Sequence, residues 1–574
     1  MAEAHDLVIR GGTVADGTGS ALREADVAVK DGVVAAVGEV AGAGREEYDA
    51  RGLLVTPGFV DIHTHYDGQA TWDARLAPSS WHGVTTAVMG NCGVGFAPCR
   101  PDDHGVLVKL MEGVEDIPGV VLTEGLRWNW ESFPEFLDAL DGRPHDIDFA
   151  AQLPHGALRV YVMGQRGADL EEATPDDINA MAKLAREAVE AGALGFTTSR
   201  TLNHRTSEGK PTPTLTAGED ELMGIALALG EAGKGVLQFV SDFKGAEEEM
   251  AMLRRLCERS GRPLSVSMAQ AERAPDAWKD LLAMIDDAAE AGLPMRAQVA
   301  GRPVGLMLGL DATLNPFVGH PAWREIVELP LAGKVERMRD PAFRARMLAQ
   351  RPATDNPFMI AVLQNFEKMF VLGDPPDYEQ APERALGAQA RARGIEAAAL
   401  AYDLMLEDEG RAMLYFPFLN YADNSLEPSL AMMKNANTVL GLGDGGAHLG
   451  TICDASFSTH MLTHWTRDRT RGDKLPIETV VKWHTQDTAA AVGLRDRGLL
   501  VPGYKADLNV IDHAGLRLRA PRMVHDLPAG GRRLMQDAEG YRLAVVSGAI
   551  TYRDGEATEA LPGRLIRGAR TAPN

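Results

Sequence analysis

Two histidines stand one residue apart at the end of an apolar segment, in TPGFVDIHTHYDG (56–68). Side chains alternate between the two faces of a strand, so His63 and His65 point to the same side. Two imidazoles at one end of a barrel strand can share a metal ion. The alternative is two polar residues near a strand end. The preceding Pro-Gly pair and apolar run favour the interpretation of His63 and His65 as metal ligands.

A carboxylate follows a second apolar run, in VLGLGDGGAH (439–448). Asp444 there can bind a metal and accept a proton from a metal-bound water as a general base. An ordinary Asp-Gly turn is the alternative, but the pairing with His63 and His65 favours catalysis. The glycines do not form a phosphate loop, because the following Lys-Ser/Thr and the spacing of a dinucleotide fingerprint are absent from the sequence.

The chain resembles the D-aminoacylase branch of the amidohydrolase superfamily, the N-acyl-D-amino-acid deacylases. The matching motifs are GFVDIHTHYDGQATWD, GVTTAVMGNCGVGFAPCRP, GDGGAH and GLRDRGLLVPGYKADLNVID, and the resemblance covers most of the chain. It implies that His63 and His65 are ligands from the first barrel strand. It also implies that Asp444, after the eighth strand, is a ligand and general base. Cys92 would be the cysteine ligand that this branch uses where other members use a modified lysine.

The position of Cys92 supports a ligand role independently of the resemblance. Cys92 ends the predicted second strand, which is adjacent to the first strand in a barrel, and a thiolate is a good zinc ligand. A small buried hydrophobic residue is the alternative, because free cysteines are commonly buried.

The sequence departs from the family pattern where two further histidines are expected. The resemblance implies one histidine at the end of strand five and one at strand six, but no histidine occurs between His204 and His320. The matching positions are Gln238, in GVLQFVSDF, and Met268, in LSVSMAQ. An amide oxygen and a thioether sulfur are poor substitutes for imidazole on zinc.

We therefore expect one divalent metal rather than two. His63, His65 and Asp444 would bind it, and Cys92, Gln238 or water would complete the shell. Zinc suits this set of ligands, and iron is the alternative if Cys92 stays out.

Further polar residues follow the fourth and eighth predicted strands. Arg200 and Arg205 are candidates for binding a substrate carboxylate, and His204 for an extra ligand or a proton donor. A solvated loop is the alternative for these three. His448 and Asp454 could also reach the barrel mouth. The candidate substrate-binding residues are Arg200, His204, Arg205, Gln238 and His448.

The middle of the chain alternates short apolar runs with helical segments. The segments 178–192 and 219–233 end on Gly192 and Gly233, which are good helix stops. Eight strands with intervening helices predict a parallel (β/α)8 barrel of the TIM type. The predicted strands are 58–65, 83–91, 147–155, 193–199, 235–241, 263–270, 294–300 and 437–444.

Both chain ends contain short alternating strands that break at Gly or Asp-Gly. We expect residues 1–56 and 498–574 to fold together as a small split β-sandwich beside a barrel formed by residues 57–497. The stretches at about 94–145 and about 302–435 are too long for one βα unit each. We interpret both as insertions that cover the active-site mouth.

The composition excludes several classes of protein. Of 574 residues, 45% are hydrophobic and 24% charged, as in ordinary globular proteins. The formal charge of -23 argues against nucleic acid as a partner. Four cysteines without a CxxC pair indicate a reducing compartment. No signal peptide or membrane-spanning apolar run is visible, so we expect a cytoplasmic protein with a small-molecule substrate. Assembly into a homo-oligomer is one alternative for this chain, beside a monomer.

The leading hypothesis is metal-dependent hydrolysis of a C–N bond, other than a peptide bond, in an N-acyl amino acid or a similar acylated amine. A barrel hosts many chemistries, so the substrate class rests on the resemblance. Ester or lactone hydrolysis, C–C cleavage and decarboxylation on the same scaffold are alternatives, motivated by the lost histidines. A non-catalytic binding protein is a further alternative, against which the retained His63, His65 and Asp444 argue.

Overall fold

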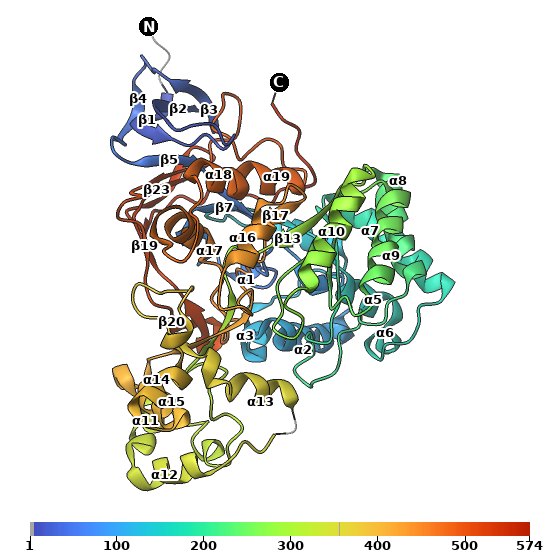
Figure 1. The fold of residues 1–574 in the computed structure, drawn as a ribbon. Coiled ribbons are helices and arrows are strands. Elements are labelled where there is room, and N and C mark those ends of the chain that lie inside the picture. Colours follow the sequence, from blue (N-terminus) through green and yellow to red (C-terminus); the bar gives the residue numbers. More distant parts are fainter. Residues whose placement is uncertain (1–4, 355, 574) are drawn as a thin grey trace.

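The computed structural model describes residues 5–354 and 356–573, and its centre is a ring of parallel strands (Figure 1). The ring consists of a three-stranded and a six-stranded sheet, in which neighbouring strands pair in parallel. Gln152 separates β8 from β9, and a parallel bridge between Thr64 and Gly445 joins the other two edges. The predicted (β/α)8 barrel is confirmed. Its strands are β6 (Phe59–Asp61), β7 (Val84–Met89), β8 (Asp148–Ala151) with β9 (Leu153–Pro154), β10 (Gly195–Arg200), β11 (Val236–Ser241), β12 (Leu264–Ser267), β13 (Met295–Val299) and β17 (Thr438–Leu440).

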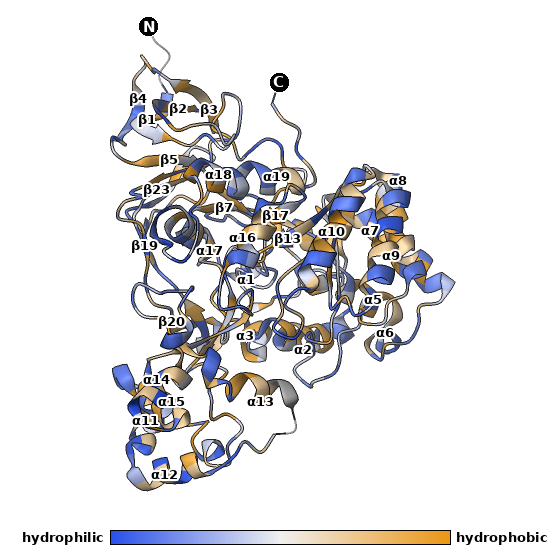
Figure 2. Cartoon of the chain, viewed as in Figure 1, coloured by the Kyte–Doolittle hydropathy of each residue, from blue (hydrophilic) through white to orange (hydrophobic). Residues whose placement is uncertain are grey.

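Helices connect the strands of the ring on its outer side. The first long one begins with a capping box, in which Thr174 and Asp177 satisfy each other's backbone amides. Gly192 and Gly233 take the left-handed conformation that ends a helix, as the sequence predicts. Figure 2 shows hydrophilic and hydrophobic residues side by side on these outer helices. They are α7 (Pro175–Ala191), α8 (Glu219–Ala232), α9 (Ala246–Ser260) and α10 (Ala277–Glu290).

In the ranges that the structure describes, no helix is long and apolar enough to span a lipid bilayer.

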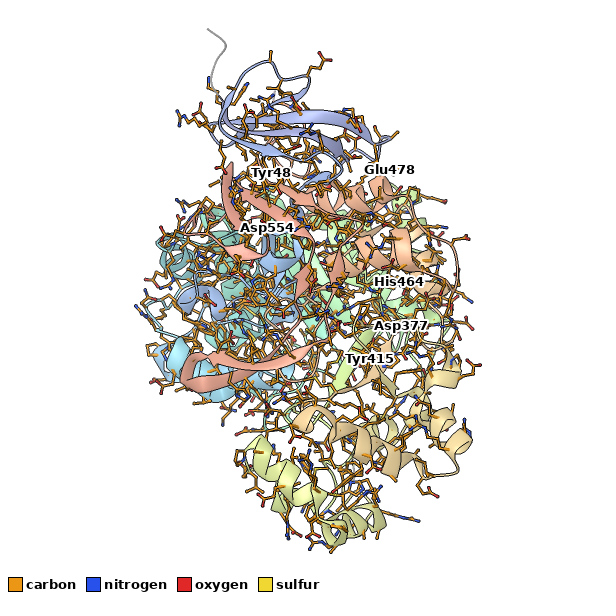
Figure 3. All side chains as sticks on the ribbon, turned by 90° about the vertical axis from the view of Figure 1, so that its left-hand side faces the viewer. Tyr48, Asp377, Tyr415, His464, Glu478 and Asp554 are labelled. Carbon is orange, nitrogen blue, oxygen red and sulfur yellow. The ribbon has the colours of Figure 1, made fainter. Side chains whose placement is uncertain are left out.

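The two chain ends meet in one nine-stranded sheet. β5 pairs antiparallel with β18, with Leu54 opposite Ile511 and Pro57 opposite Leu508. This pairing joins the N-terminal strands to the C-terminal ones. The sheet's core draws buried side chains from both ends of the chain. In Figure 3, Tyr48 and Asp554 lie at this end of the molecule. The strands are β1 (His5–Val14), β2 (Arg23–Lys30), β3 (Val33–Gly38), β4 (Gly44–Asp49), β5 (Leu54–Pro57), β18 (Leu508–Ile511), β23 (Tyr541–Val546), β24 (Ala549–Arg553) and β25 (Glu556–Ala557).

Part of the C-terminal segment leaves this sheet. The hairpin of β20 (Arg522–Leu527) and β21 (Gly531–Met535) forms a ribbon of its own. The backbone amide of Leu534 in β21 donates to the carbonyl oxygen of Leu449 at 2.6 Å. This hairpin therefore reaches the loop that follows the last barrel strand.

The segment after β13 forms a lobe with a hydrophobic core of its own. Its strands β14 (Val304–Leu308), β15 (Phe370–Val371) and β16 (Leu414–Leu419) form an antiparallel sheet. Figure 1 places the lobe at the opposite end of the molecule from β1 to β4. The lobe's helices are α11 (Leu331–Arg339), α12 (Pro341–Ala349), α13 (Pro357–Leu363), α14 (Leu386–Arg393) and α15 (Ala397–Met405), and α16 (Glu427–Lys434) leads back to β17.

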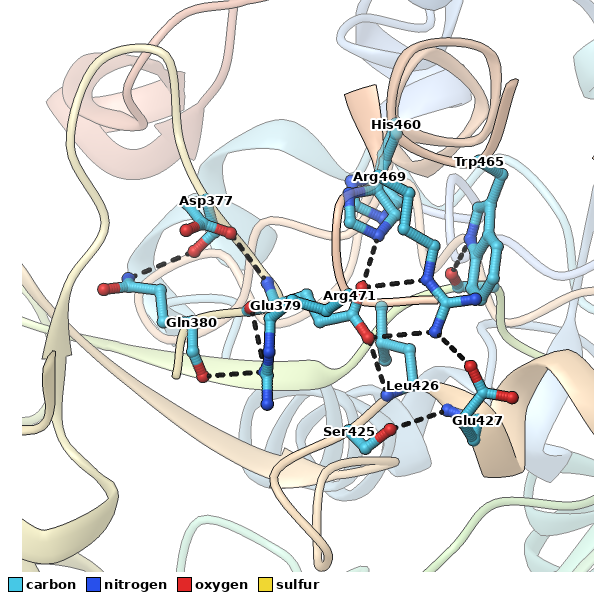
Figure 4. A network of polar contacts seen from close by, with 12 residues as sticks. Asp377, Glu379, Gln380, Ser425, Leu426, Glu427, His460, Trp465, Arg469 and Arg471 are labelled. Carbon is cyan, nitrogen blue, oxygen red and sulfur yellow. Dashed lines mark hydrogen bonds and ion pairs between the residues drawn. The ribbon is translucent and has the colours of Figure 1, made fainter. Parts of the chain in front are cut away.

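A buried carboxylate ties this lobe to the rest of the chain (Figure 4). Two nitrogens of Arg469 lie 3.0 Å from the Glu379 oxygens, and Nε2 of His464 lies 2.9 Å away. The backbone amide of Leu426 donates to Glu379 at 3.1 Å. Burial alone would raise the pKa of Glu379, but the hydrogen bonds from His464 and Arg469 outweigh it and lower the pKa to about 2.

Candidate metal centre

The chain carries both histidines of the HxH motif from the end of β6 into the barrel. Their imidazoles are almost completely buried, and the ring centres lie 5.5 Å apart. The carboxylate of Asp61 accepts a hydrogen bond from the His63 amide at 3.1 Å. The His65 amide donates to the carbonyl oxygen of Gly445 at 2.7 Å. These bonds fix the backbone from which the two imidazoles project.

Four donor atoms converge beside the end of β6. Nε2 of His63 lies 3.3 Å from Sγ of Cys92 and 3.5 Å from Oδ1 of Asp444. Nε2 of His65 lies 3.7 Å from the same Asp444 oxygen. Ligand atoms of the two histidines and Cys92 all lie within 4.8 Å of one another. Two nitrogens, one sulfur and one carboxylate oxygen form a donor set that suits zinc.

Unusual backbone conformations present Cys92 and Asp444 to this point. Both residues have positive φ angles, 54° and 49°, which is uncommon for residues other than glycine and clusters at functional sites. Gly90 precedes Cys92 with φ of 84°, and a Cβ atom there would lie 2.3 Å from the carbonyl oxygen of Gln152. The tight turn at the end of β7 therefore requires the glycine of the GNCG motif.

Each histidine has an oxygen partner on its far side. Oε1 of Gln298 lies 2.8 Å from Nδ1 of His63, and the Gln298 amide nitrogen donates to Oγ of Ser265 at 3.0 Å. The glutamine oxygen therefore accepts from His63, which leaves the Nε2 lone pair of His63 for a ligand role. Nδ1 of His65 lies 3.3 Å from Oε1 of Glu115, at the end of α2 (His104–Glu115).

Neither Gln298 nor Glu115 was predicted from the sequence. Gln298 was detectable as a polar residue near the end of the predicted seventh strand. Glu115 had no local signal, because it lies on a helix inside the first insertion.

The charges of the site fit a bound cation. Burial alone would raise the pKa of Asp444, but the neighbouring histidines, with His65 first, hold it well below the usual range. Burial raises the pKa of the Cys92 thiol to about 11. Within the described ranges, both ring nitrogens of His65 and both oxygens of Glu115 are buried without a hydrogen-bond partner. Such buried polar atoms are rare, and a cation at Nε2 of His65 would satisfy one of them.

The two positions where the family pattern has histidines are occupied differently. Gln238, on β11, donates to Oγ of Ser267 at 3.2 Å, and its buried Oε1 has no hydrogen-bond partner among the described residues. Met268 follows β12 and is buried in the main hydrophobic core. Neither of these two side chains carries an imidazole nitrogen that could bind a second ion.

Two further histidines lie beside the centre. Nδ1 of His204 lies 2.7 Å from Oγ of Ser199. Burial, and then the charges of His448 and His65, lower the pKa of His204 to about 3. His448 is about one quarter exposed, and its Nε2 lies 3.7 Å from Oε2 of Glu115.

The remaining candidate residues, Arg200, Arg205 and Asp454, bond to groups other than the four donor atoms of the centre. Nε of Arg200 lies 3.0 Å from Oε1 of Glu249, on α9. Arg205 is exposed and donates to the carbonyl oxygens of its own loop, Leu202 and Gly209. Asp454 forms a buried ion pair of 2.8 Å with Arg302.

Comparison with known proteins identifies the family to which the chain belongs. Residues 46–552 match the model of the amidohydrolase family (Amidohydro_3), so the chain belongs to that family and is a hydrolase of this class.

Similar proteins include two deacylases from Alcaligenes xylosoxydans xylosoxydans. Its D-aminoacylase is 27% identical over 99% of each chain. Its N-acyl-D-aspartate deacylase is 35% identical over 34% of this chain and 36% of that protein. A solved D-aminoacylase, described as having a binuclear centre activated by one metal and attenuated by the second, is 25% identical. It has a TM-score of 0.64, with 99% of this chain and 100% of that chain covered. The fold and family predicted from the sequence are confirmed.

Proposed function

We propose that this amidohydrolase removes the acyl group from an N-acyl amino acid or a similar acylated amine, using one divalent metal. The observation that carries the proposal is the convergence of two imidazole Nε2 atoms on the Asp444 carboxylate beside Cys92. The similarity to deacylases supports the substrate class.

The chain's own residues would hold the metal. His63, His65, Asp444 and Cys92 provide a four-atom shell that favours zinc, and iron is the alternative if Cys92 stays out. When bound, a divalent cation polarises the scissile carbonyl and makes a water molecule more acidic. The D-aminoacylase described as activated by one metal supports a count of one.

Asp444 would move the proton. Its side chain is 13% exposed, whereas those of His63 and His65 are 1% exposed, so Asp444 is the more accessible member of the set. Its carboxylate is ionised at neutral pH and can accept a proton from the attacking water. Delivery of that proton to the departing nitrogen completes the hydrolysis, with a carboxylic acid and an amine as products.

Residues around the centre would bind the remainder of the substrate. We assign His204 and His448 to contacts with the substrate and Arg205 to its carboxylate, because Arg205 bonds only to backbone carbonyls in the described ranges. Arg200 is less available, because Glu249 already pairs with it. Gln238 is a further candidate through its buried, unpartnered oxygen.

We propose that the two insertions shape the mouth of the barrel. Asp116, next to Glu115 in the first insertion, accepts from Oγ1 of Thr313 in the second insertion at 3.0 Å. The same carboxylate accepts from the amide of Gly450 at 3.1 Å. Both insertions therefore touch the loop that follows Asp444, which supports a role in admitting substrate.

Elemental analysis combined with a substrate panel tests the proposal. We expect one equivalent of metal in active protein, faster hydrolysis of N-acyl amino acids than of esters or lactones, and neither metal nor activity in His63→Ala. Two equivalents in fully active protein, or full activity in metal-free His63→Ala, would contradict the proposal.

A different metal-assisted reaction on the same scaffold is the second candidate. Gln238 and Met268, in place of the two expected histidines, favour it because two imidazole ligands of the family pattern are missing. A preference for esters or lactones in the panel, or cleavage or decarboxylation without amide hydrolysis, would support this candidate.

A further inference from the structure

Glu115 is a buried carboxylate in an unusual environment. Its side chain is 1% exposed, and neither oxygen has a hydrogen-bond partner in the part of the chain that the structure describes. Its two ion-pair contacts are imidazoles: Nδ1 of His65 at 3.3 Å and Nε2 of His448 at 3.7 Å. A buried charge is costly unless it is paired. We therefore take His65 and His448 to be the groups that the carboxylate orients.

The backbone around Glu115 fixes the direction of its side chain. The carbonyl oxygen of Glu115 accepts a hydrogen bond from the amide of His448. The next residue, Asp116, ends α2 in a left-handed conformation, and its carboxylate is engaged by Thr313 and Gly450. Asp116 therefore anchors the helix end, and Glu115 is left to face the metal centre.

The two ligand histidines differ in the charge of their partners. His63 has the neutral amide oxygen of Gln298, whereas His65 has the carboxylate of Glu115. A carboxylate on the far nitrogen orients a ligating imidazole and makes it a stronger electron donor. The site is thus built so that His65 would bind the metal more tightly than His63.

We propose that Glu115 is a positioning residue that holds His65 toward the metal and His448 at the mouth of the barrel. This inference rests on the proposed metal-dependent function. Glu115 acts through the two imidazoles and contacts no reacting atom.

Zinc affinity, measured by competition with a chelator, provides the first test. Glu115→Ala should weaken zinc binding by about 10- to 100-fold, the range for lost partners of ligating histidines. Glu115→Gln should lose less, because its amide oxygen can still accept from His65. The matched control is Glu112→Gln, one turn earlier on α2, which should bind zinc like the wild type. Affinity of Glu115→Ala within twofold of the wild type would overturn the proposal.

Thermal unfolding separates positioning from a merely structural role. Without metal, Glu115→Gln should melt at or below the wild-type temperature, because the substitution removes the charged partner of two imidazoles. The increase in melting temperature on adding zinc should be smaller than in the wild type. An unchanged zinc-induced increase, whatever the melting temperature without metal, would contradict the proposal.

A double-mutant cycle at saturating zinc tests the contact with His448. Glu115→Gln and His448→Gln should be non-additive in kcat/KM, because each removes the same pair. Additive effects would remove His448 from the proposal.

The results also distinguish this inference from the proposed function. If zinc affinity depends on Glu115 but no substrate of the panel is hydrolysed, only the proposed function fails. If the wild type hydrolyses N-acyl amino acids but its zinc affinity is insensitive to Glu115, only the inference fails.

Discussion

Gln298 accepts a hydrogen bond from Nδ1 of His63 at 2.8 Å. The two residues belong to the seventh and first strand positions of the barrel, with the eighth strand, β17, between them. The orientation of a metal-ligand candidate therefore depends on a side chain that lies across a neighbouring strand, and that side chain is itself held by Ser265.

Replacing Gln298 should weaken metal binding without unfolding the barrel. Gln298→Leu removes the oxygen that orients His63, and we expect zinc affinity to fall by about 10- to 100-fold. Chelator competition measures this loss. Gln298→Glu retains an acceptor of the same reach and should bind zinc at least as tightly as the wild type. Equal losses in both variants would show that packing, rather than the hydrogen bond, is responsible.

Asp444→Asn should separate metal binding from turnover. The variant retains an oxygen but loses the proton acceptor, so kcat should fall by about 100- to 10,000-fold or more. Circular dichroism and melting temperature should match the wild type if the fold is intact. Steady-state kinetics on N-acyl amino acids provide the measurement. Turnover within tenfold of the wild type would exclude Asp444 as the base.

Arg200, at the end of β10, and Arg205, in the loop that follows, should behave differently. Arg205→Ala should raise KM for substrates with a carboxylate by about tenfold or more, and should spare neutral analogues, because a charge-assisted hydrogen bond is lost. Arg200→Ala should instead lower stability by up to about 1 kcal/mol, because it breaks the ion pair with Glu249. Kinetics on paired charged and neutral substrates decide the matter, and equal effects of Arg205→Ala on both would remove the carboxylate assignment.

Glu379 should contribute stability that depends on pH. Its pKa falls from 4.5 in the unfolded reference to about 2 in the fold, so its contribution is complete above about pH 4.5 and is lost as the pH falls toward about 2. The shift corresponds to about 3 kcal/mol at neutral pH. Urea unfolding at about pH 7, 5 and 3 should show a wild-type advantage over Glu379→Gln that shrinks at the lowest pH.

The control for this measurement is Glu556→Gln, at an exposed position of β25. Its stability should follow the wild type at each pH. A constant difference between the wild type and Glu379→Gln across the range would contradict the linkage.

The sequence predicted the barrel well because its strands are marked locally. Apolar runs, terminal glycines and helical spacing define β10, β11 and β13 to within about two residues of the predicted limits. The first strand is shorter than predicted, since β6 ends at Asp61. After Asp61, the amide of His63 donates to the Asp61 carboxylate and that of His65 donates to the Gly445 carbonyl oxygen. These bonds replace the regular hydrogen-bond ladder of a strand.

Pairing between distant segments was harder to predict. In the second insertion, β14 pairs with β16, which lies more than a hundred residues later in the chain. No short-range sequence pattern indicates such a distant partner. The hairpin of β20 and β21 likewise reaches Leu449 through the tertiary fold alone.

The same distinction applies to the candidate site. His63, His65 and Asp444 stand next to strands, where the sequence pattern itself suggests a role. Glu115 ends a helix in an insertion, and only the three-dimensional return of that helix brings its carboxylate to His65.

The pairing of β5 with β18 has a consequence for synthesis of the chain. Leu54 leaves the ribosome hundreds of residues before its partner Ile511. At ~5–20 residues per second, the N-terminal strands therefore wait for tens of seconds with one sheet edge open. An open edge can pair with another nascent chain. The charged residues of β4, in GREEYD, disfavour pairing with another chain at that part of the sheet. The sequence of β5, LVTP, contains no charged residue that would do the same. Synthesis of β18, rather than collapse of the first strands, is therefore the event that closes this edge.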